Sequence, residues 1–349
     1  MYAPRKILIR ATNWIGDAVM SVPALRAIRG QFPSAEIVVL ARPWVADLYA
    51  RERAIDRVIR LTAARGVRDW GAKWRLAREL AAERFDCAIL LQNAFEAALI
   101  ARLAGIPRRI GYDRDGRGWL LTDAVRVPRP GEIPRHERFY YLELLRRAGL
   151  IDAMPDSDSI RLDGADAASL EGTRRFAEMG LERPVIGVSP GAAYGNAKRW
   201  LPESFAETAG RVASEHGASV AVFGSADERA LCELVSALIA SSGAETRCLA
   251  GETSLREFIE LAAACELYLT NDSGAMHIAS ALGVPTVAVF GATDDTTTGP
   301  TGPLSRVVRE SVECSPCLKR ECPIDHRCMT RVGPERVADV ALSLLKGTN

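Results

Sequence analysis

The chain alternates short apolar runs with longer amphipathic segments along almost its whole length. The apolar run 6–11 (KILIRA), for example, precedes residues 18–31, in which apolar residues recur at helical spacing. Strands separated by helices form βαβ units, and their strands pair in parallel. The alternation therefore predicts an α/β protein built from doubly wound, Rossmann-like parallel sheets.

The same periodicities set the expected elements. Strands are expected at 6–11, 36–41, 55–61, 87–92, 108–111, 185–189, 219–224, 246–249, 267–271 and 286–291. Helices are expected at 18–31, 69–84, 95–104, 165–179, 203–216, 227–240, 255–264, 275–282 and 334–346.

A chain of 349 residues is too long for one ordinary domain and suits two. The segment from about 152 to 184 begins with a stretch rich in Asp, Ser, Gly and Pro, and it marks the linker. We expect domains at 1–165 and 166–333 and a final helix within 334–349, which packs back toward the first domain. If the two sheets face each other, their strand-end loops line a cleft.

Composition excludes several classes of protein. The 45 basic and 44 acidic residues give a net charge of +1, which argues against an electrostatic grip on nucleic acid. The start of the chain has no export signal, and no apolar run is long enough to span a bilayer. Eight cysteines are too few for a disulfide scaffold, so we expect a soluble, cytoplasmic protein with reduced thiols.

Polar residues follow the expected strand 267–271 in the motif Asn-Asp-Ser-Gly-Ala-Met-His (271–277). The amide groups at the start of a helix form an anion site, so Asp272, Ser273 and Gly274 are candidate ligand-binding residues. Asp272 or Ser273 could equally cap the helix. His277 lies in the first turn, where it either belongs to the site or merely packs.

A second strand-end loop, residues 189–200 (SPGAAYGNAKRW), carries Lys198, one of only five lysines. Small residues allow a phosphate close to the backbone, and Lys198 adds a positive charge. The spacing is not that of a Walker A loop, and an ordinary surface loop is the alternative.

Two further strand-to-helix turns carry carboxylates. Asp17, in Asn-Trp-Ile-Gly-Asp (13–17), is either a general base or the N-cap of the following helix, and the sequence alone favours the cap. Asp227 and Glu228 either bind a ribose diol or complement the helix dipole. No strand is followed by GxGxxG, which disfavours a nicotinamide or flavin enzyme.

Four cysteines, Cys314, Cys317, Cys322 and Cys328, fall within fifteen positions. Their spacing fits a structural zinc site, with free thiols as the alternative, and disfavours an iron–sulfur cluster.

Basic residues interleaved with Trp70 and Trp74 gather in the first half, where they either grip an anionic acceptor or form a solvated face. They are Arg65, Arg68, Lys73, Arg75, Arg78, Arg108, Arg109, Arg114, Arg117, Arg135, His136 and Arg138.

The motifs together resemble glycosyltransferase family 9. The resemblance rests on RATNWIGDAVMSVPALRAIR, SPGAAYGNAKRW, FGSADE, LAGETSL and NDSGAMHIASALGVPTVAVFGATD, and it runs from Lys6 to about Arg331. The stretch CSPCLKRECPIDHRC and the loop NWIGD are most similar to the heptosyltransferase II branch of that family.

This resemblance implies a GT-B architecture and an inverting transfer of L-glycero-D-manno-heptose from ADP-heptose to the first heptose of the lipopolysaccharide inner core. It implies that Asp17 is the general base and that Lys198 neutralises the departing diphosphate. It assigns donor binding to backbone groups of Ala193 and Tyr194, to Glu228 at the ribose, to Thr253 at adenine, to Asp272 at the heptose hydroxyls, and to Ser273, Gly274 and the helix start at the diphosphate. His277 in the first turn of that helix is a further candidate donor-binding residue.

By the same resemblance, the first domain binds the acceptor and the second the donor. No cofactor is required beyond the donor substrate. The partners are ADP-heptose and a heptosyl-Kdo2-lipid A type acceptor, and the protein is a monomer at the cytoplasmic face of the inner membrane. The alternatives are another family 9 transferase, a nucleotide-sugar epimerase of the same fold, and a non-catalytic nucleotide- or metal-binding regulator.

Overall fold

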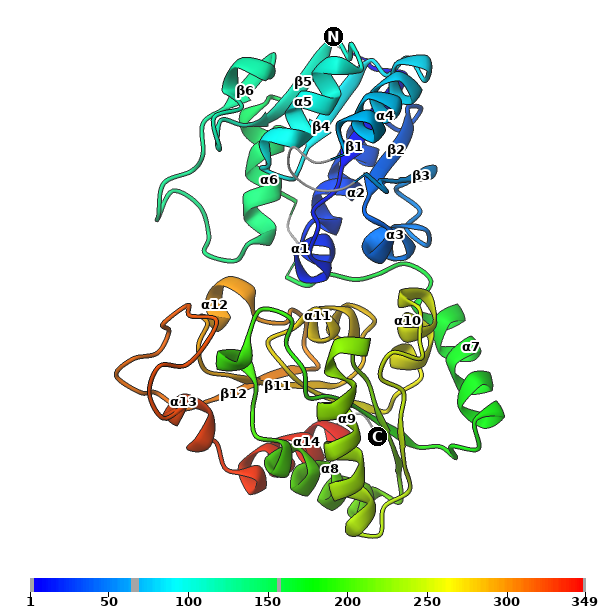
Figure 1. The fold of residues 1–349 in the computed structure, drawn as a ribbon, viewed down its shortest axis with the longest axis vertical. Coiled ribbons are helices and arrows are strands. Elements are labelled where there is room, and N and C mark those ends of the chain that lie inside the picture. The colour runs from blue at the N-terminus through cyan, green and yellow to red at the C-terminus, as the bar shows by residue number, and fades with distance from the viewer. Residues whose placement is uncertain (1–2, 64–68, 156–157, 348–349) are drawn as a thin grey trace. The chain divides into compact units, whose positions relative to one another are not determined.

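The computed structural model describes residues 3–63, 69–155 and 158–347, and the chain divides into two compact units, residues 1–157 and 158–349 (Figure 1). Arg65 and Arg68, two of the basic residues singled out above, lie outside the described residues.

Unit 1 is a parallel sheet with helices on both faces (Figure 1). Its strands are β1 (Lys6–Arg10), β2 (Glu36–Ala41), β3 (Arg57–Arg60), β4 (Cys87–Leu90), β5 (Arg108–Tyr112) and β6 (Asp123–Val125). They lie in the order β3-β2-β1-β4-β5-β6, and every pairing is parallel. The helices are α1 (Ile15–Met20), α2 (Val22–Gln31), α3 (Pro43–Tyr49), α4 (Trp70–Ala82), α5 (Phe95–Leu103) and α6 (Arg138–Arg147), with a 3₁₀ turn η1 (Gly118–Leu120).

Unit 2 repeats this topology. Its strands are β7 (Val185–Ser189), β8 (Ser219–Val222), β9 (Thr246–Cys248), β10 (Leu267–Asn271), β11 (Thr286–Phe290) and β12 (Ser305–Arg309), in the order β12-β11-β10-β7-β8-β9. The helices are α7 (Ala165–Glu178), α8 (Pro202–His216), α9 (Arg229–Ser241), α10 (Leu255–Ala263), α11 (Gly274–Ala281), α12 (Asp295–Thr298), α13 (Arg327–Thr330) and α14 (Pro334–Gly347). Two 3₁₀ turns, η2 (Asn196–Lys198) and η3 (Ala226–Glu228), follow β7 and β8.

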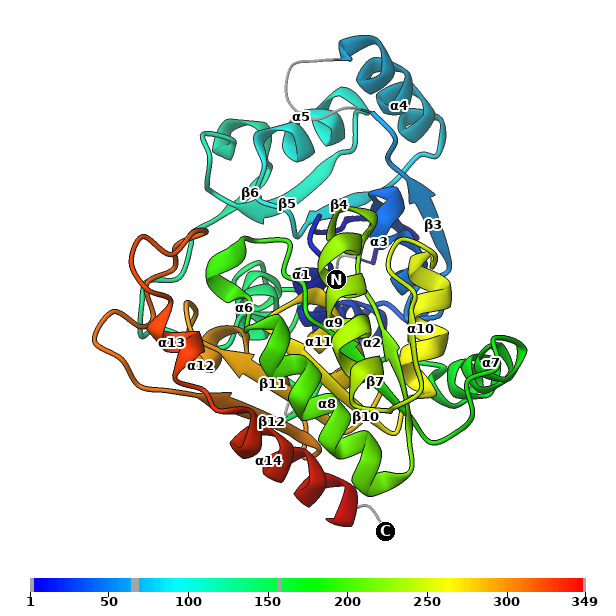
Figure 2. The same cartoon turned by 60° about the horizontal axis from the view of Figure 1, so that its bottom comes forward.

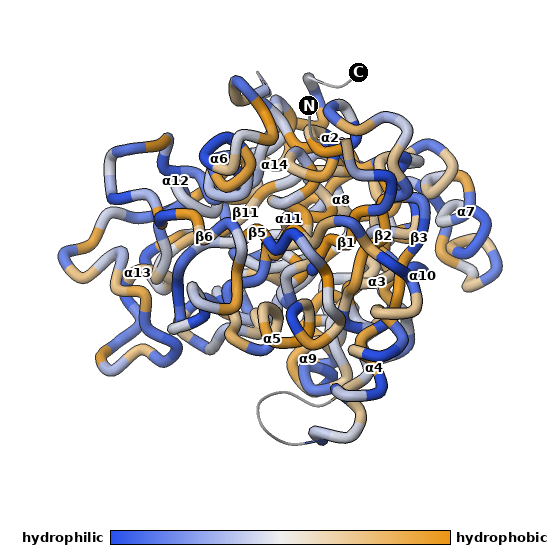
Figure 3. Tube along the Cα trace, turned by 90° about the horizontal axis from the view of Figure 1, so that it is seen from above, coloured by the Kyte–Doolittle hydropathy of each residue, from blue (hydrophilic) through white to orange (hydrophobic). Residues whose placement is uncertain are grey.

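Counted from the first strand of each unit, both sheets have the doubly wound order 3-2-1-4-5-6. The predicted α/β class with two Rossmann-like sheets is therefore confirmed. The inner strands are buried on both faces, as expected for a parallel sheet covered by helices, whereas edge strands such as β3 and β12 are partly exposed. In Figure 3, β1 and β2 run in orange, the colour of hydrophobic residues.

The expected helix 18–31 is wrong as one element, since the structure has α1 and α2 with Ser21 between them. Pro23 has no backbone N–H to donate to the preceding turn, so the first helix cannot continue through it. Pro23 instead lies near the start of α2, where a missing donor is tolerated. Elements absent from the sequence prediction include α3, α6, β6, α12, β12 and α13.

Unit 2 begins before α7 because residues 158–164 already pack on it. Ile160 and Leu162 are buried, and their backbone N–H groups donate to Thr301 Oγ1 and the Ala281 carbonyl, both at 2.9 Å. Helix α7 then packs against α10. At the other end of the unit, α14 packs against α8, as Figure 2 shows.

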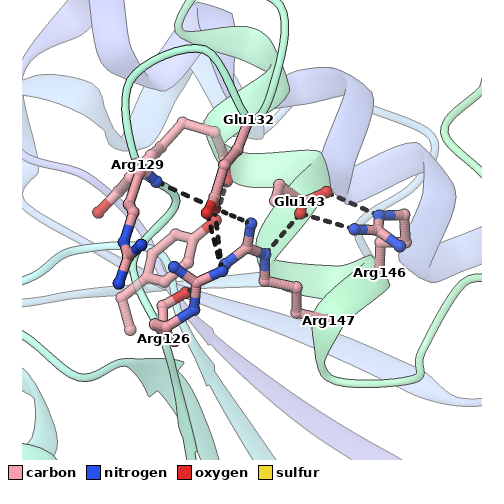
Figure 4. A network of polar contacts seen from close by, with 8 residues as sticks. Arg126, Arg129, Glu132, Glu143, Arg146 and Arg147 are labelled. Atoms are coloured by element: carbon pink, nitrogen blue, oxygen red, sulfur yellow. Dashed lines mark hydrogen bonds and ion pairs between the residues drawn. The ribbon is translucent and has the colours of Figure 1, made fainter.

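Hydrogen bonds and ion pairs between arginines and glutamates join the loop after β6 to α6 (Figure 4). Glu143 is 1% exposed and accepts hydrogen bonds from Arg146 Nε at 2.7 Å and Arg147 Nε at 2.5 Å. Arg147 Nη2 also donates to Glu132 at 2.7 Å, and Arg126 Nη2 and the Arg129 N–H donate to the same carboxylate at 3.0 Å. These bonds, led by that from Arg147, lower the pKa of Glu132 from 4.5 to about 2.

We expect Gly172→Ala to lower the free energy of unfolding by about 1–3 kcal/mol, because a side chain at the α7–α10 contact overpacks it. A Cβ at Gly172 would lie 1.9 Å from the Glu260 carbonyl oxygen, which is backbone and cannot swing aside. Gly30→Ala in α2 is the matched control, since nothing lies within 4 Å of its Cβ position. Urea unfolding compares the two variants, and equal midpoints would contradict a close helix contact.

Glu132→Gln is expected to destabilise the protein at pH 7, and the difference from wild type should shrink in acid. A carboxyl whose pKa is lowered on folding stabilises the folded state above its unfolded pKa, here 4.5, and this is lost as the pH falls towards about 2. Urea midpoints measured between pH 7 and pH 3 test this. A difference that stays constant over that range would show that the Glu132 charge does not stabilise the loop.

Candidate active site

The order of strands in unit 2 reverses between β7 and β10, which lie side by side. Doubly wound sheets bind ligands at such switch points, beyond the carboxyl ends of the strands. The loops that leave these two strands are residues 190–198 and 272–273, the two segments with the strongest sequence motifs. The fold therefore brings together two motifs about eighty positions apart.

Lys198 and Asp272 form an ion pair at this point. Lys198 Nζ lies 2.5 Å from Asp272 Oδ2, and their side chains are only 13% and 5% exposed. Thr293, which follows β11, donates its hydroxyl to the same oxygen at 2.6 Å. The site thus holds one ammonium in a fixed place, neutralised by a carboxylate that is itself hydrogen-bonded.

The side-chain amide of Asn271 links the end of β10 to the loop after β7 by hydrogen bonds. Its Nδ2 donates to the Pro190 carbonyl at 2.7 Å, and its Oδ1 accepts from the Trp200 N–H at 2.9 Å. Trp200 is 1% exposed in the core of unit 2, so the end of the lysine loop is anchored on a buried ring. Asn271 is fully buried, and its described side-chain hydrogen bonds all join β10 to the loop after β7.

The start of α11 shows which residue caps this helix. Ser273 is the N-cap, and its hydroxyl accepts from the Met276 N–H at 3.4 Å. Asp272 is therefore not the cap, and its carboxylate is directed at Lys198. Gly274 is the first residue of α11, and His277 is 6% exposed in its first turn.

Tyr194 borders the ion pair. Its ring lies between two cations, with Lys198 Nζ at 4.9 Å and the Arg320 guanidinium at 5.2 Å from the centroid. Its hydroxyl donates to the Leu318 carbonyl at 2.9 Å, which ties the loop to the cysteine-rich segment. The neighbouring Ala193 is exposed, so its backbone is accessible from solvent.

Glu228 lies against the start of the lysine loop. A Cβ on Gly191 would come within 2.2 Å of Glu228 Oε1, so the carboxylate lies directly against the backbone of the loop. The same carboxylate completes a capping box with Ser225, accepting from the serine N–H and hydroxyl at 3.0 Å. These bonds hold the carboxylate beside the loop. Thr253 is half-buried, just before Ser254, the N-cap of α10.

Asp17 lies in the first turn of α1, and the expectation that it caps this helix is wrong. The helix begins at Ile15 after Trp14, because residues 15–17 already have helical geometry. Asp17 is half-buried beside two tyrosines. Burial raises the pKa of Tyr49 to about 12 and that of Tyr141 well above its usual range, and the negative charge of Asp17 contributes to both.

Two basic residues expected to face an anionic acceptor are instead buried. Arg117 is 0% exposed, and burial lowers its pKa to about 10. Its guanidinium donates to the Tyr112 and Gln92 carbonyls, so it joins the loops after β5 and β4. Lys73 is 2% exposed and pairs with Glu96 at 3.5 Å.

The cysteine cluster gives the predicted zinc no support. In the part of the chain that the structure describes, no three His, Cys, Asp or Glu side chains are grouped to hold a metal ion. All eight cysteines are free thiols. Burial raises the pKa of Cys328, and the nearby Cys314, Cys317 and Cys322 add to the rise. Across 3–63, 69–155 and 158–347, no helix has the length and apolar character to cross a membrane.

Comparison with known proteins identifies the family. Residues 73–327 match the model of glycosyltransferase family 9 (heptosyltransferase). Lipopolysaccharide heptosyltransferase 2 from Salmonella typhimurium is 35% identical over 97% of this chain and 98% of its own length. The Escherichia coli protein of the same name is 34% identical with the same coverage.

The chain belongs to glycosyltransferase family 9. A solved structure, that of Escherichia coli ADP-heptose lps heptosyltransferase II, matches it with a TM-score of 0.83 at 30% identity, over 98% of this chain and 99% of that one. This match confirms the predicted GT-B fold class. Membership makes the protein a transferase, which disfavours the epimerase and the non-catalytic regulator.

Residues that sequence reasoning missed support this family 9 site. Thr293 was not singled out, and Asn271 was given no role although it opens the motif 271–277. Thr293 follows β11, and Asn271 is the last residue of β10. Their position at strand ends could have marked both as candidate site residues from the sequence. The partners they hold, Asp272 and the Pro190 carbonyl, are set by strand order and could not be known from the sequence.

We expect Lys198→Met to lower the free energy of unfolding by about 3–5 kcal/mol, because it leaves the Asp272 carboxylate buried without its cation. The double variant K198M/D272N should recover part of that loss, since no uncompensated charge remains. A double-mutant cycle in urea measures the coupling. Strictly additive losses would mean that the two charges do not stabilise each other in the folded protein.

Proposed function

We propose that this glycosyltransferase transfers L-glycero-D-manno-heptose from ADP-heptose to the first heptose of the lipopolysaccharide inner core, with inversion. The observation that carries the proposal is the full-length similarity to named heptosyltransferases 2, together with an ammonium fixed at the switch point of unit 2. The Escherichia coli structure, named for ADP-heptose and lipopolysaccharide, supports the same donor and acceptor.

In this proposal unit 2 binds the donor. Lys198 and the amide groups at the start of α11, around Ser273 and Gly274, receive the diphosphate. Asp272 accepts hydrogen bonds from the heptose hydroxyls while it holds Lys198 in place. A preorganised ammonium costs no reorganisation when negative charge grows on the leaving ADP, so it stabilises the transition state more than the ground state.

The remaining proposed donor contacts come from residues in or beside the strand-end loops of unit 2. Backbone groups of Ala193 and Tyr194 border the phosphates, and Glu228 accepts hydrogen bonds from the ribose diol. The backbone at Thr253 meets the adenine, and His277 supports the α11 start from within. Support for the Glu228 role is its contact with Gly191, which sets the carboxylate against the lysine loop.

Asp17, in the acceptor-binding unit 1, is the proposed general base. The acceptor hydroxyl oxygen bonds to the anomeric carbon, the bond from that carbon to the ADP oxygen breaks with its electron pair on ADP, and Asp17 takes the hydroxyl proton. A β-linked donor thereby gives an α-linked product. Support for this role is the position of Asp17, which is half-buried in the first turn of α1, directly after the carboxyl end of β1.

The proposal includes the setting of the reaction. The acceptor is of the heptosyl-Kdo2-lipid A type, and the enzyme is a cytoplasmic monomer that contacts the inner membrane peripherally. No cofactor beyond the donor is assigned.

Mass spectrometry of a defined heptosylated inner-core acceptor, incubated with ADP-heptose and the protein, tests the proposal. An added mass of one heptose with release of one ADP is the expected result. Transfer from another nucleotide sugar but not from ADP-heptose would show that this is a different family 9 transferase.

Asp17→Asn is expected to lower kcat by about 10²–10⁴-fold, the usual contribution of a general base, with ADP binding unchanged. Asp47→Asn is the control, since it removes a carboxylate from α3 of the same unit, where Asp47 pairs with Arg60 at the surface. Steady-state kinetics and calorimetry with ADP measure both effects. A D17N enzyme with wild-type kcat would remove Asp17 from the chemistry.

A further inference from the structure

The cysteine-rich segment (314–328) lies against the lysine loop of unit 2. It connects β12 to α13, which Figure 1 labels. The Arg320 carbonyl accepts from the Ala197 N–H at 3.0 Å, and a Cβ on Gly195 would lie 2.1 Å from the same carbonyl oxygen. The two backbones are therefore in direct contact, and the loop that carries Lys198 sets the position of Arg320.

Further bonds tie the same part of the segment to the other side of the site. The Leu318 N–H donates to the Ala292 carbonyl at 2.8 Å, and the Leu318 carbonyl accepts from the Tyr194 hydroxyl at 2.9 Å. Ala292 directly precedes Thr293, whose hydroxyl donates to Asp272. This part of the segment is thus held between the loops after β7 and β11, which carry the two described partners of the Asp272 carboxylate.

The guanidinium of Arg320 lies against the ring of Tyr194. It is 5.2 Å from the ring centroid, and Lys198 Nζ is 4.9 Å from the same centroid. Arg320 is exposed, and within the described residues its guanidinium has no ion pair or hydrogen bond. An aromatic ring attracts cations, so this ring keeps two positive charges near each other, one of them without a counter-charge.

The charge balance of the site gives this cation a use. Asp272 neutralises Lys198, so their pair has no net charge to offer a diphosphate, which is negative on each of its phosphates. Arg199, the next residue of the loop, is also compensated, since its Nη2 lies 4.0 Å from Glu228 Oε1. Arg320, by contrast, keeps its full charge.

We propose that Arg320 is a second cation of the donor site and binds the diphosphate of the donor. Its planar guanidinium offers paired N–H groups that match two phosphate oxygens, and such charge-assisted bonds are stronger than those between neutral groups. The Tyr194 ring holds the guanidinium near Lys198 before the donor arrives. The identity of the donor rests on the proposed function, whereas binding of ADP, which carries the same two phosphates, requires no transfer.

Calorimetry with ADP and the full-length protein tests the proposal. Arg320→Gln should raise the Kd of ADP by about 10–100-fold, the usual contribution of a hydrogen bond to a charged group. Adenosine, which lacks the phosphates, should bind R320Q and wild type equally when it competes with ADP. Arg320→Lys, which keeps the charge but not the planar fork, should recover part of the lost affinity.

Lys319 supplies the matched control. It is exposed and precedes Arg320, and within the described residues its side chain has no ion pair or hydrogen bond. Lys319→Gln removes the same charge from the same segment and should leave the Kd of ADP at its wild-type value. Urea midpoints verify that both variants fold.

Three results would overturn the proposal. They are a wild-type Kd of ADP in R320Q, a loss of ADP affinity in K319Q that matches the loss in R320Q, and equal losses of ADP and adenosine affinity in R320Q. The last would show that Arg320 only steadies the loop, because a displaced loop weakens both ligands alike.

A double-mutant cycle tests the part played by the ring of Tyr194. Tyr194→Leu removes the surface that holds the guanidinium, so R320Q should cost less ADP affinity in the Y194L protein than in wild type. Additive losses would overturn the positioning of Arg320 by the ring.

Steady-state kinetics with ADP-heptose separate the role of Arg320 from the proposed function. In an enzyme that transfers heptose, R320Q should raise the donor KM and leave the acceptor KM unchanged. An unchanged donor KM in active R320Q would overturn the role of Arg320 alone. Absence of transfer by the folded wild type would overturn the proposed function and leave the result of the ADP calorimetry standing.

Discussion

Parallel pairing with a reversal of strand order is the constraint on which both units depend. Since all strands of a sheet point the same way, every loop that follows a strand reaches the same edge. The reversal between β1 and β4, and again between β7 and β10, separates neighbouring helices and leaves room there. The Lys198–Asp272 pair and a pocket between α4 and α5, which Asn13 and Gln92 also line, occupy these two places.

At each switch point, one carboxylate interacts with two partners, at least one of which is a largely buried cation. In unit 2 one carboxylate, Asp272, serves one cation and one hydroxyl, and in unit 1 one carboxylate, Glu96, serves two cations. Removing such groups from water costs more than their attraction commonly returns, so they are poor devices for stability alone.

The sequence predicted regular elements well where apolar periodicity was strong. The bounds of β2, β7 and β10 agree with the structure, because long buried runs between turn residues leave little choice. The short α3 and the edge strand β12 were missed, because their residues are few or half-exposed and show little periodicity. The cap at α1 was misplaced because helix geometry begins at an apolar residue, Ile15, rather than after the carboxylate.

For the candidate sites, the sequence showed which loops carry functional residues but not which residues interact with each other. Lys198 and Asp272 were both found as strand-end residues, yet their pairing follows from β7 and β10 being neighbours, which no local pattern encodes. Lys73 shows the opposite failure. It was expected either to grip an anionic acceptor or to lie on a solvated face, and only the packing of α4 on α5 reveals that its ammonium pairs with Glu96.

The two units use tryptophan differently, and this difference follows their proposed roles. Trp200 is buried in unit 2, where it fixes the lysine loop through its backbone N–H. In unit 1, Trp14, Trp44, Trp70, Trp74 and Trp119 are all about half exposed or more. Exposed rings give up burial free energy that a packed core would gain. Under the proposed function, unit 1 binds a lipid-borne acceptor, and an acceptor of that kind carries apolar surface that a small polar donor lacks.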